Sequence, residues 1–257
     1  MGFGWLAAVA LIIVIGPFIG LLIRADWGNL PSALASQTAT QALWLSLKTG
    51  LLATIVCFLL GLPLAWVLAR SRAPGLRLLR ALVLLPLVLP PMAGGLALLY
   101  LLGRRGLLGT PLAAWGVTLP FSTTAVVIAQ VFVALPFFVI TVESGLEALG
   151  TDFEEVAATL GAGPWQTLWY VTLPMLRPSL IAAIGLTFAR ALGEFGATAL
   201  FAGNSPGRTQ TMPLAIYTAF NGGEAGPDTA VALTLLLVAS AAVIIGLGQF
   251  FTSRGRR

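Results

Sequence analysis

The segment from residue 143 to residue 177 holds five of the nine acidic side chains in the sequence. It contains one base, Arg177, and five acids, namely Glu143, Glu147, Asp152, Glu154 and Glu155. Carboxylates can accept short, charge-assisted hydrogen bonds from arginine and lysine. The segment is therefore suited to contact a basic surface.

A short helix is predicted within this segment, over residues 151–160. Thr151 can cap its start, and Glu154, three residues later, would complete a capping box. Residues at helical spacing form one apolar face, namely Phe153, Val156, Ala157 and Leu160. Gly161 and Pro164 follow and end the helix. Because two turns of helix are not stable alone in water, this helix needs a surface to pack on, either on a partner or on its own chain.

Catalytic and metal chemistry find little support in the residue types. Histidine is absent, and the single cysteine, Cys57, lies in an apolar run. This removes imidazole ligands, His-dependent nucleophiles and any intramolecular disulfide. The nucleotide-binding pattern GxxxxGK(S/T) is missing, because Leu47 precedes the only lysine, Lys48. We expect no catalytic residue, no metal and no bound cofactor in this chain.

The elements that position the acidic loop are predicted to be membrane helices. Of the 257 residues, 58% are hydrophobic and 9% are charged, whereas a soluble domain carries about 25% charged residues. The long charge-free runs reach the length of about 20 residues that a helix needs to cross the hydrocarbon core. The sequence predicts an all-α integral membrane protein of one domain, 1–257, with spans at about 4–23, 45–68, 81–102, 121–142, 177–200 and 229–251, and a loop at 143–176.

The arginines predict how these spans are oriented. A large group of them lies in the link after the second span and in the C-terminal tail, namely Arg70, Arg72, Arg77, Arg80, Arg254, Arg256 and Arg257. Lys and Arg are retained on the cytoplasmic side, so we expect this link, the acidic loop and both termini in the cytoplasm, and the segment 204–212 outside. The net charge of +5 has the same origin. The sequence has no basic stripe with interleaved aromatic residues, so it does not indicate nucleic-acid binding. The N-terminal apolar run, residues 5–23, is longer than the roughly 7–15 residues of a signal peptide's apolar region. We therefore expect it to be a retained membrane span.

Two of the predicted spans contain unusual residues. Pro90 and Pro91 interrupt the third span and exclude a straight helix; such breaks line transport pathways or are packing kinks. Arg190 and Glu194 in the fifth span are four residues apart and can pair on one helix face. If Arg177 marks the cytoplasmic entry, this pair lies about 20 Å further along, in the outer half of the span. We predict that these residues shape a gate, with a fixed structural pair as the alternative.

The acidic loop resembles the EAA loop of ABC importer permeases. That motif reads E-A-A, three residues, G, nine residues, I-x-L-P. Glu155, Val156 and Ala157, then Gly161, then residues 171–174 (VTLP) reproduce its spacing. Val stands for the first Ala and for the Ile, and both changes are conservative.

The resemblance extends to the molybdate permease branch of this superfamily, with sulfate permeases as near relatives. It is carried by four further segments, namely 85–91, 103–106 (GRRG), 189–198 (ARALGEFGAT) and 206–217 (PGRTQTMPLAIY). It implies the fold of a type I importer permease and transport of molybdate across a bacterial inner membrane, with tungstate and sulfate as alternatives.

The same resemblance implies a set of partners and coupling residues. The short helix would be the coupling helix that docks into a groove on a cytoplasmic ATPase, through Glu154, Glu155, Ala157, Gly161 and Pro174. Two ATPase copies would use ATP and Mg, an external protein would deliver the oxyanion, and a second copy of this permease would complete the pathway.

Two other function classes compete with this interpretation. An ion-coupled secondary transporter needs coupling residues inside its spans, for which only Arg190 and Glu194 clearly qualify, and it needs no acidic cytoplasmic helix. An intramembrane enzyme needs a nucleophile with its base, and the sequence has no histidine and no GxGD motif. The sequence favours the importer over both.

Overall fold

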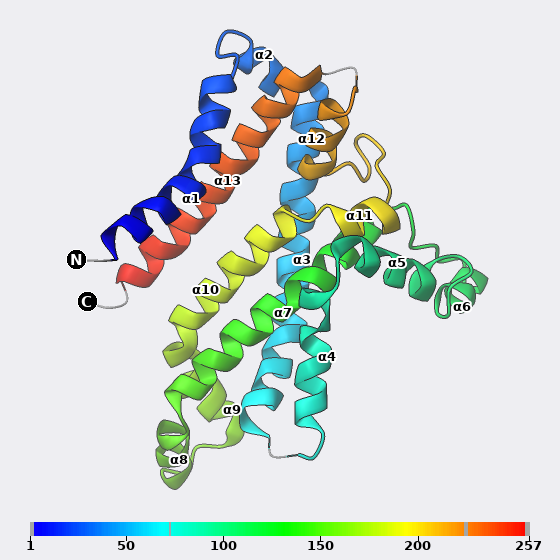
Figure 1. Cartoon of the computed structure of the whole chain (residues 1–257). Coiled ribbons are helices and arrows are strands. Elements are labelled where there is room, and N and C mark those ends of the chain that lie inside the picture. The colour runs from blue at the N-terminus through cyan, green and yellow to red at the C-terminus, as the bar shows by residue number, and fades with distance from the viewer. Residues whose placement is uncertain (1–2, 72, 224–225, 255–257) are drawn as a thin grey trace.

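The computed structural model describes residues 3–71, 73–223 and 226–254, so Arg72, Arg256 and Arg257 lie outside the described residues. Within these ranges the chain is helical and has no strand (Figure 1). The helices, with one π-helical turn η1, are α1 (Gly4–Arg24), α2 (Leu30–Ala35), α3 (Gln37–Arg70), α4 (Leu76–Val88), α5 (Pro91–Leu102), α6 (Gly109–Ala114), α7 (Thr123–Leu149), α8 (Asp152–Thr159), α9 (Pro164–Thr167), η1 (Leu168–Thr172), α10 (Leu173–Leu192), α11 (Gly196–Phe201), α12 (Met212–Phe220) and α13 (Gly226–Arg254).

Five helical stretches of the described chain are long and apolar enough to cross a membrane, and the bent pair α4–α5 would make a sixth. The five are α1, α3, α7, the continuous run from α9 through η1 to α10, and α13. The predicted all-α membrane architecture is therefore confirmed. Helix α7 continues past the predicted span limit at residue 142 to Leu149 and carries Glu143 and Glu147 as helical residues.

Helices α3, α7 and α10 form the centre of the bundle. Their contact surfaces combine small residues with larger apolar ones, namely Ala53, Cys57 and Ala65 of α3, Phe138, Val139 and Val142 of α7, and Leu176 and Ala183 of α10. Gly61 of α3 faces Phe138 so closely that a Cβ there would lie 2.6 Å from the ring. Small residues at helix interfaces allow close approach, which stabilises packing in membranes.

The third predicted span is broken rather than straight. Helices α4 and α5 meet at an angle of 116°, close to Pro90 and Pro91. A continuing helix would require the N–H groups of residues 90 and 91 to bond to the carbonyls of Pro86 and Leu87, and proline has no N–H. The predicted proline break in the third span is confirmed.

The fifth predicted span, 177–200, is wrong at its outer end. Helix α10 ends at Leu192, and α11 starts at Gly196 in a new direction (Figure 1). Glu194 contributes to this break, because its Oε1 accepts a hydrogen bond of 2.8 Å from the N–H of Ala197 in the first turn of α11. A carboxylate there satisfies one of the unpaired N–H groups at a helix start.

Within the predicted outer segment 204–212, residues 204–208 are exposed and only residues 209–212 are buried. Thr209, Gln210 and Thr211 are buried, and the N–H of Met212 donates a hydrogen bond of 2.8 Å to Ser46 Oγ on α3. Helix α12 follows, between the fifth and sixth predicted spans. Residues 209–211 are polar and lack helical periodicity, so their burial was not visible from the sequence.

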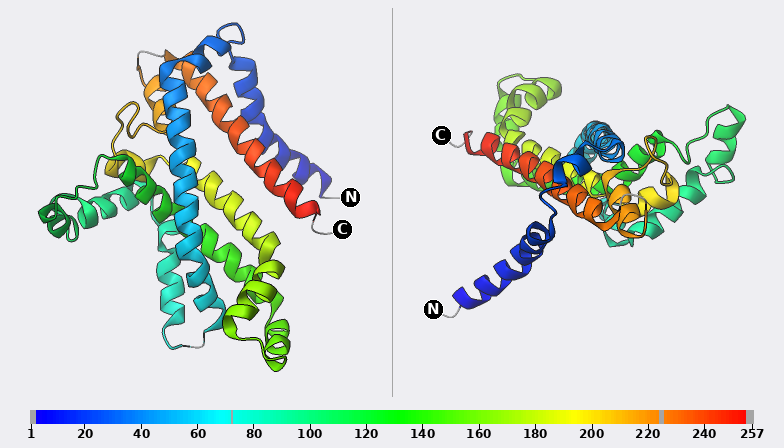
Figure 2. Two further views of the ribbon diagram at one scale, coloured as in Figure 1. Left: turned by 180° about the vertical axis from the view of Figure 1, so that it is seen from behind. Right: turned by 90° about the horizontal axis from the view of Figure 1, so that it is seen from above.

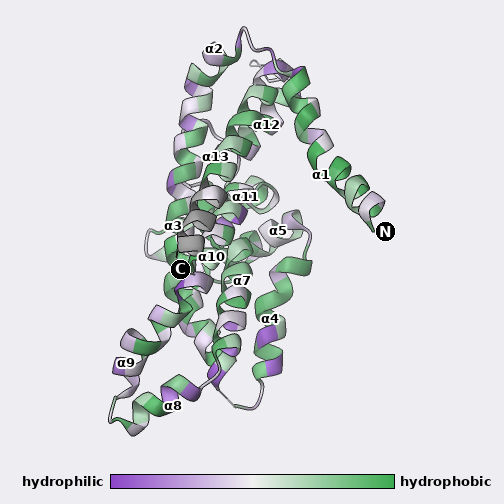
Figure 3. Ribbon diagram, turned by 90° about the vertical axis from the view of Figure 1, so that its left-hand side faces the viewer, coloured by the Kyte–Doolittle hydropathy of each residue, from purple (hydrophilic) through white to green (hydrophobic). Residues whose placement is uncertain are grey.

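Helix α1 stands apart from the other helices. None of its residues is buried, and Figure 2 shows it diverging from the bundle toward its N-terminal end. Hydrophobic colour dominates along it in Figure 3, whereas α8 and the start of α4 carry hydrophilic residues. A helix that is apolar on all sides needs lipid or another chain around it.

Candidate functional site

The predicted short helix exists as α8 and lies at one end of the bundle (Figure 1). None of its residues is buried. Three apolar side chains point away from the chain, with Phe153 58%, Val156 57% and Leu160 83% exposed. Ala157, by contrast, is half-buried. The apolar face predicted for α8 is therefore an uncovered surface on this chain.

The predicted capping box at the start of α8 is wrong. The Thr151 side chain makes no capping hydrogen bond and instead donates from Oγ1 to Glu155 Oε1 at 2.9 Å. Glu154 turns back toward the membrane helices. The two neighbouring acids therefore have different environments, with Glu155 exposed on the outer surface and Glu154 half-buried.

Glu154 is held by a side chain that sequence reasoning treated only as an orientation signal. Arg70, the last residue of α3, donates to Glu154 Oε1 from Nε at 3.3 Å and from Nη2 at 3.0 Å. The same Nη2 donates to the carbonyl of Gly150 at 2.6 Å, at the end of α7. Thr172 Oγ1, in η1, also donates to Glu154 Oε1, at 3.3 Å. One carboxylate oxygen thus joins α3, α8 and η1.

The remaining predicted coupling residues lie around α8. Gly161 follows it with a φ of +88°, in the left-handed region that disfavours side chains. This confirms the expected backbone conformation. Pro174 is the second residue of α10 and follows η1 directly, so it lies within the continuous helical run and, having no N–H, donates no backbone hydrogen bond there.

The other acids of the loop pair with the chain itself. Arg80 of α4 forms a close ion pair with Glu143 of α7 and lies 3.4 Å from Glu147. With Glu154 also paired, Asp152 and Glu155 are the two of these five acids that form no ion pair within the described part of the chain.

A second group of predicted residues meets at the bend between α4 and α5. A cavity of about 130 Å³ lies there, lined by Pro86, Leu87, Leu89, Pro90, Pro91, Gly94, Phe132, Val133, Phe137 and Arg190. Arg190 is the only charged residue in this lining. Its Nη2 lies 3.0 Å from Glu194 Oε2, and the two side chains are 26% and 1% exposed. The structure thus brings Pro90, Pro91 and Arg190 together, while Glu194 sits behind Arg190.

The depth of this pair follows from its neighbours on α3. A Cβ at Gly50 would meet the side chains of Phe188 and Leu192 at 3.3 Å. Gly50 lies closer to Gln37 than to Arg70 on α3, so the pair lies in the half of the bundle away from α8. The position of the pair in the outer half of the membrane stays a prediction.

Buried polar side chains without a hydrogen-bond partner also occur in the described part of the chain. They are Gln130, Thr187, Thr198 and Thr211. Sequence reasoning missed all four; for Thr187 and Thr198, which lie in helices, the ordinary expectation is a hydrogen bond to the helix backbone. Buried polar atoms of this kind call for water or a ligand. The centre of the bundle is therefore more polar than its composition suggests.

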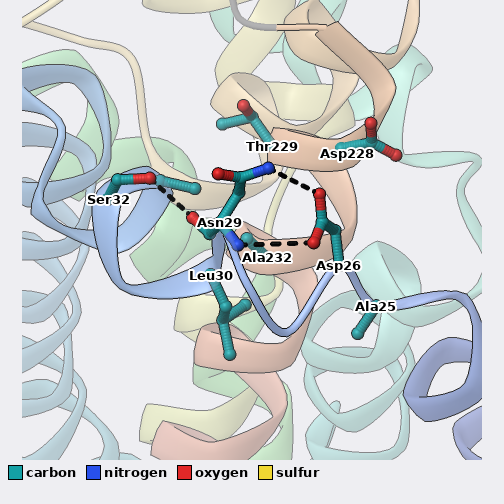
Figure 4. Close-up of a pocket in the computed structure, with 9 residues that line it drawn as sticks. Ala25, Asp26, Asn29, Leu30, Ser32, Asp228, Thr229 and Ala232 are labelled. Atoms are coloured by element: carbon teal, nitrogen blue, oxygen red, sulfur yellow. Dashed lines mark hydrogen bonds between the residues drawn. The ribbon is translucent and has the colours of Figure 1, made fainter.

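A larger cavity of about 250 Å³ lies between the α1–α2 loop and the start of α13 (Figure 4). Asp26 and Asp228 line it. The side chain of Asn29 donates to Asp26 Oδ2 at 2.8 Å, and this hydrogen bond lowers the pKa of Asp26 below its usual value. Two carboxylates repel an anion, so this cavity does not suit an oxyanion. The described residues hold no cluster of three or more Cys, Asp or Glu side chains that could bind a metal.

Comparison with known sequences identifies relatives over almost the whole chain. The family of binding-protein-dependent transport system inner membrane components matches residues 58–254. The molybdenum transport system permease protein ModB of Mycobacterium tuberculosis is 50% identical over 95% of this chain and 92% of its own length. ModB of Escherichia coli is 40% identical over 84% and 94%, respectively. The sulfate transport system permease protein CysT of Escherichia coli is 33% identical over 96% and 89%.

Solved structures confirm the fold. A bacterial alginate ABC transporter, in complex with its alginate-bound periplasmic protein, matches with a TM-score of 0.77 at 18% identity, over 97% of this chain and 94% of that chain. The MetNI methionine ABC transporter, in an inward-facing conformation, matches with a TM-score of 0.66 at 20% identity, over 84% and 94%. The chain belongs to the family of binding-protein-dependent transport system inner membrane components, as a multi-pass permease of the molybdenum transport branch.

Proposed function

We propose that this chain is the permease subunit of an ATP-driven importer of molybdate in a bacterial inner membrane, with both termini in the cytoplasm. The observation that carries this proposal is the uncovered coupling helix α8, in a chain that is half identical to ModB along nearly its full length. An independent secondary transporter has no use for such a helix. The sulfate permeases are more distant, so molybdate is the first candidate and tungstate or sulfate the alternatives.

The coupling helix supplies the contact with a separate ATPase subunit. Phe153, Val156 and Leu160 offer an exposed apolar edge, and burying such side chains in a groove stabilises the complex by about 25 cal/mol for each Å² of apolar surface removed from water. Glu155, exposed on the opposite side of the helix, would accept a charge-assisted hydrogen bond from a basic residue of that groove. Two ATPase copies, which bind ATP and Mg, would act on two copies of this permease.

The cavity at the α4–α5 bend supplies a step of the substrate pathway. Arg190 is its only charged lining residue and is partly exposed to it. The guanidinium group has five N–H donors, and its ion pair with Glu194 involves one nitrogen, Nη2. The remaining donors can contact a passing oxyanion, while the proline and phenylalanine side chains around them restrict the passage of water.

Reconstitution of the purified permease in liposomes tests the function. The permease is combined with the neighbouring ATPase and the external binding protein, and uptake of radiolabelled molybdate is measured with ATP or a non-hydrolysable analogue inside. We expect uptake only with all three proteins and hydrolysable ATP. Unlabelled tungstate and sulfate in excess then rank the substrates. Proton- or sodium-driven uptake by the permease alone would replace the proposal with secondary transport.

A further inference from the structure

The coupling helix α8 is attached to the membrane helices in two different ways. The chain joins it to α7 through residues 150–151 and to α10 through α9 and η1. Helix α3, in contrast, ends about 80 residues earlier in sequence, at Arg70. A displacement of α8 therefore reaches α7 and α10 along the backbone, but it reaches α3 only through side-chain contacts.

The Arg70–Glu154 ion pair is that contact. Its side chains are 14% and 19% exposed, so solvent screens the pair less than it screens an exposed one. Arg70 approaches Glu154 through two nitrogens and also holds the Gly150 carbonyl. Its guanidinium lies 5.9 Å from the centre of the Trp66 ring, one turn earlier in α3, and this stacking restricts its movement. The pair is therefore held in one geometry rather than forming a loose surface contact.

Helix α3 extends from this pair to the buried segment beyond α11. Ser46 accepts the hydrogen bond from Met212, and the 24 residues between Ser46 and Arg70 correspond to about 36 Å of helix. Gly50, between these two ends, contacts α10 close to Arg190. Helix α3 thus touches the coupling loop, the region of the charged cavity and Met212, which directly follows the buried segment 209–211.

We propose that Arg70 and Glu154 are positioning residues that couple α8 to α3, so that movement of the docked ATPase shifts the helix that borders the pathway. The inference rests on the proposed importer function and adds a residue pair to it. Glu154 would then act inside the permease, while Glu155 faces the ATPase. Neutralising either member of the pair should leave the ATPase docked on α8 but uncouple ATP hydrolysis from molybdate uptake.

The experiment uses the complete importer in liposomes and compares Arg70→Gln, Glu154→Gln and the double variant with wild type. ATP hydrolysis and molybdate uptake are measured on the same samples, and ATPase retention by the purified permease is measured separately. We expect retention to stay near wild type and the uptake per ATP hydrolysed to fall about 5-fold or more, the lower limit for typical coupling between sites. The double variant should be no worse than either single variant, because both remove one interaction.

Controls separate coupling from general damage. Arg77→Gln removes a positive charge from the same link at an exposed position, and it should keep the wild-type ratio. Arg70→Lys keeps the charge but loses the two-nitrogen contact, so it should fold and give an intermediate ratio even if Arg70→Gln does not assemble. The coupling role of the pair is overturned if Glu154→Gln and Arg70→Lys both keep the wild-type uptake per ATP hydrolysed. It is also overturned if the variants lose ATPase retention to the same extent as they lose uptake. Absence of uptake in wild type would instead overturn the importer function itself.

Discussion

Removing Arg190 should damage the protein more than removing its partner Glu194. Glu194 is 1% exposed and Arg190 is 26% exposed. Without Arg190, the Glu194 carboxylate stays buried with one backbone N–H as its hydrogen-bond donor. Without Glu194, the arginine still has the cavity beside it. The two single variants are therefore expected to differ, although each breaks the same ion pair.

The burial of the two side chains sets the expected magnitudes. Breaking a buried pair by removing one partner costs about 3–5 kcal/mol, and Arg190→Ala should reach this range because the orphaned carboxylate is fully enclosed. Glu194→Ala should cost about 1–3 kcal/mol, because it loses the pair and the contact to Ala197 but leaves a charge that solvent in the cavity can reach. The double variant, Arg190→Ala with Glu194→Ala, should be more stable than Arg190→Ala alone. It should approach the stability of Glu194→Ala, because no charge is then buried without a partner.

Thermal unfolding of the purified variants in detergent, followed by molybdate uptake in liposomes, measures the two consequences separately. We expect the double variant to regain stability close to Glu194→Ala while its uptake stays low, because the cavity then lacks its charged donor. Recovery of both stability and uptake in the double variant would refute the pathway role and leave a purely structural pair. Equal stability of the two single variants would refute the burial argument.

Further predictions concern the coupling loop, the orientation and the core. Glu155→Ala and Gly161→Val should each weaken ATPase retention in a pull-down while membrane expression stays normal; wild-type retention and uptake would remove their coupling role. Reporter fusions after Arg105 and after Arg177 should report opposite compartments, and matching signals would mean that a span is miscounted. Gly61→Leu should overpack the α3–α7 contact at Phe138 and lower stability by about 1–3 kcal/mol, measured by thermal unfolding; an unchanged melting temperature would contradict the close approach.

The features that follow from single segments were predictable from the sequence. Composition and charge spacing predicted the membrane helices, the proline run predicted the break before α5, and the motif around Gly161 predicted a helix with a sharp turn after it. Each of these depends on local chemistry, such as the missing N–H of proline or the left-handed conformation of a glycine. The structure places them where the sequence indicated.

The features that depend on contacts between distant segments were not predictable. Arg70 and Glu154 are 84 residues apart, so nothing local shows that one side chain takes the other away from the capping role. The end of α10 at Leu192 was missed for a different reason, because its cause is local: Glu194 accepts a hydrogen bond from the N–H of Ala197, three residues further on. Only at Glu154 does a short-range preference lose to a tertiary hydrogen bond.

The charge balance at the bend has a consequence for where affinity resides in the proposed importer. Arg190 is neutralised by Glu194, and the rest of the cavity lining is apolar apart from its backbone groups. An oxyanion entering this cavity gains hydrogen bonds but no net positive charge, while it loses water. Such a site holds its substrate weakly, and a pathway needs sites that release the ion as readily as they accept it. Selective, tight binding is then left to the external binding protein.

Glu194→Gln tests this reasoning, since it keeps a polar side chain beside Ala197 and frees the charge of Arg190. We expect Glu194→Gln to bind molybdate more tightly in the purified permease, by equilibrium dialysis, and to release it more slowly during uptake. Unchanged molybdate binding would show that the charge of Arg190 does not reach the cavity.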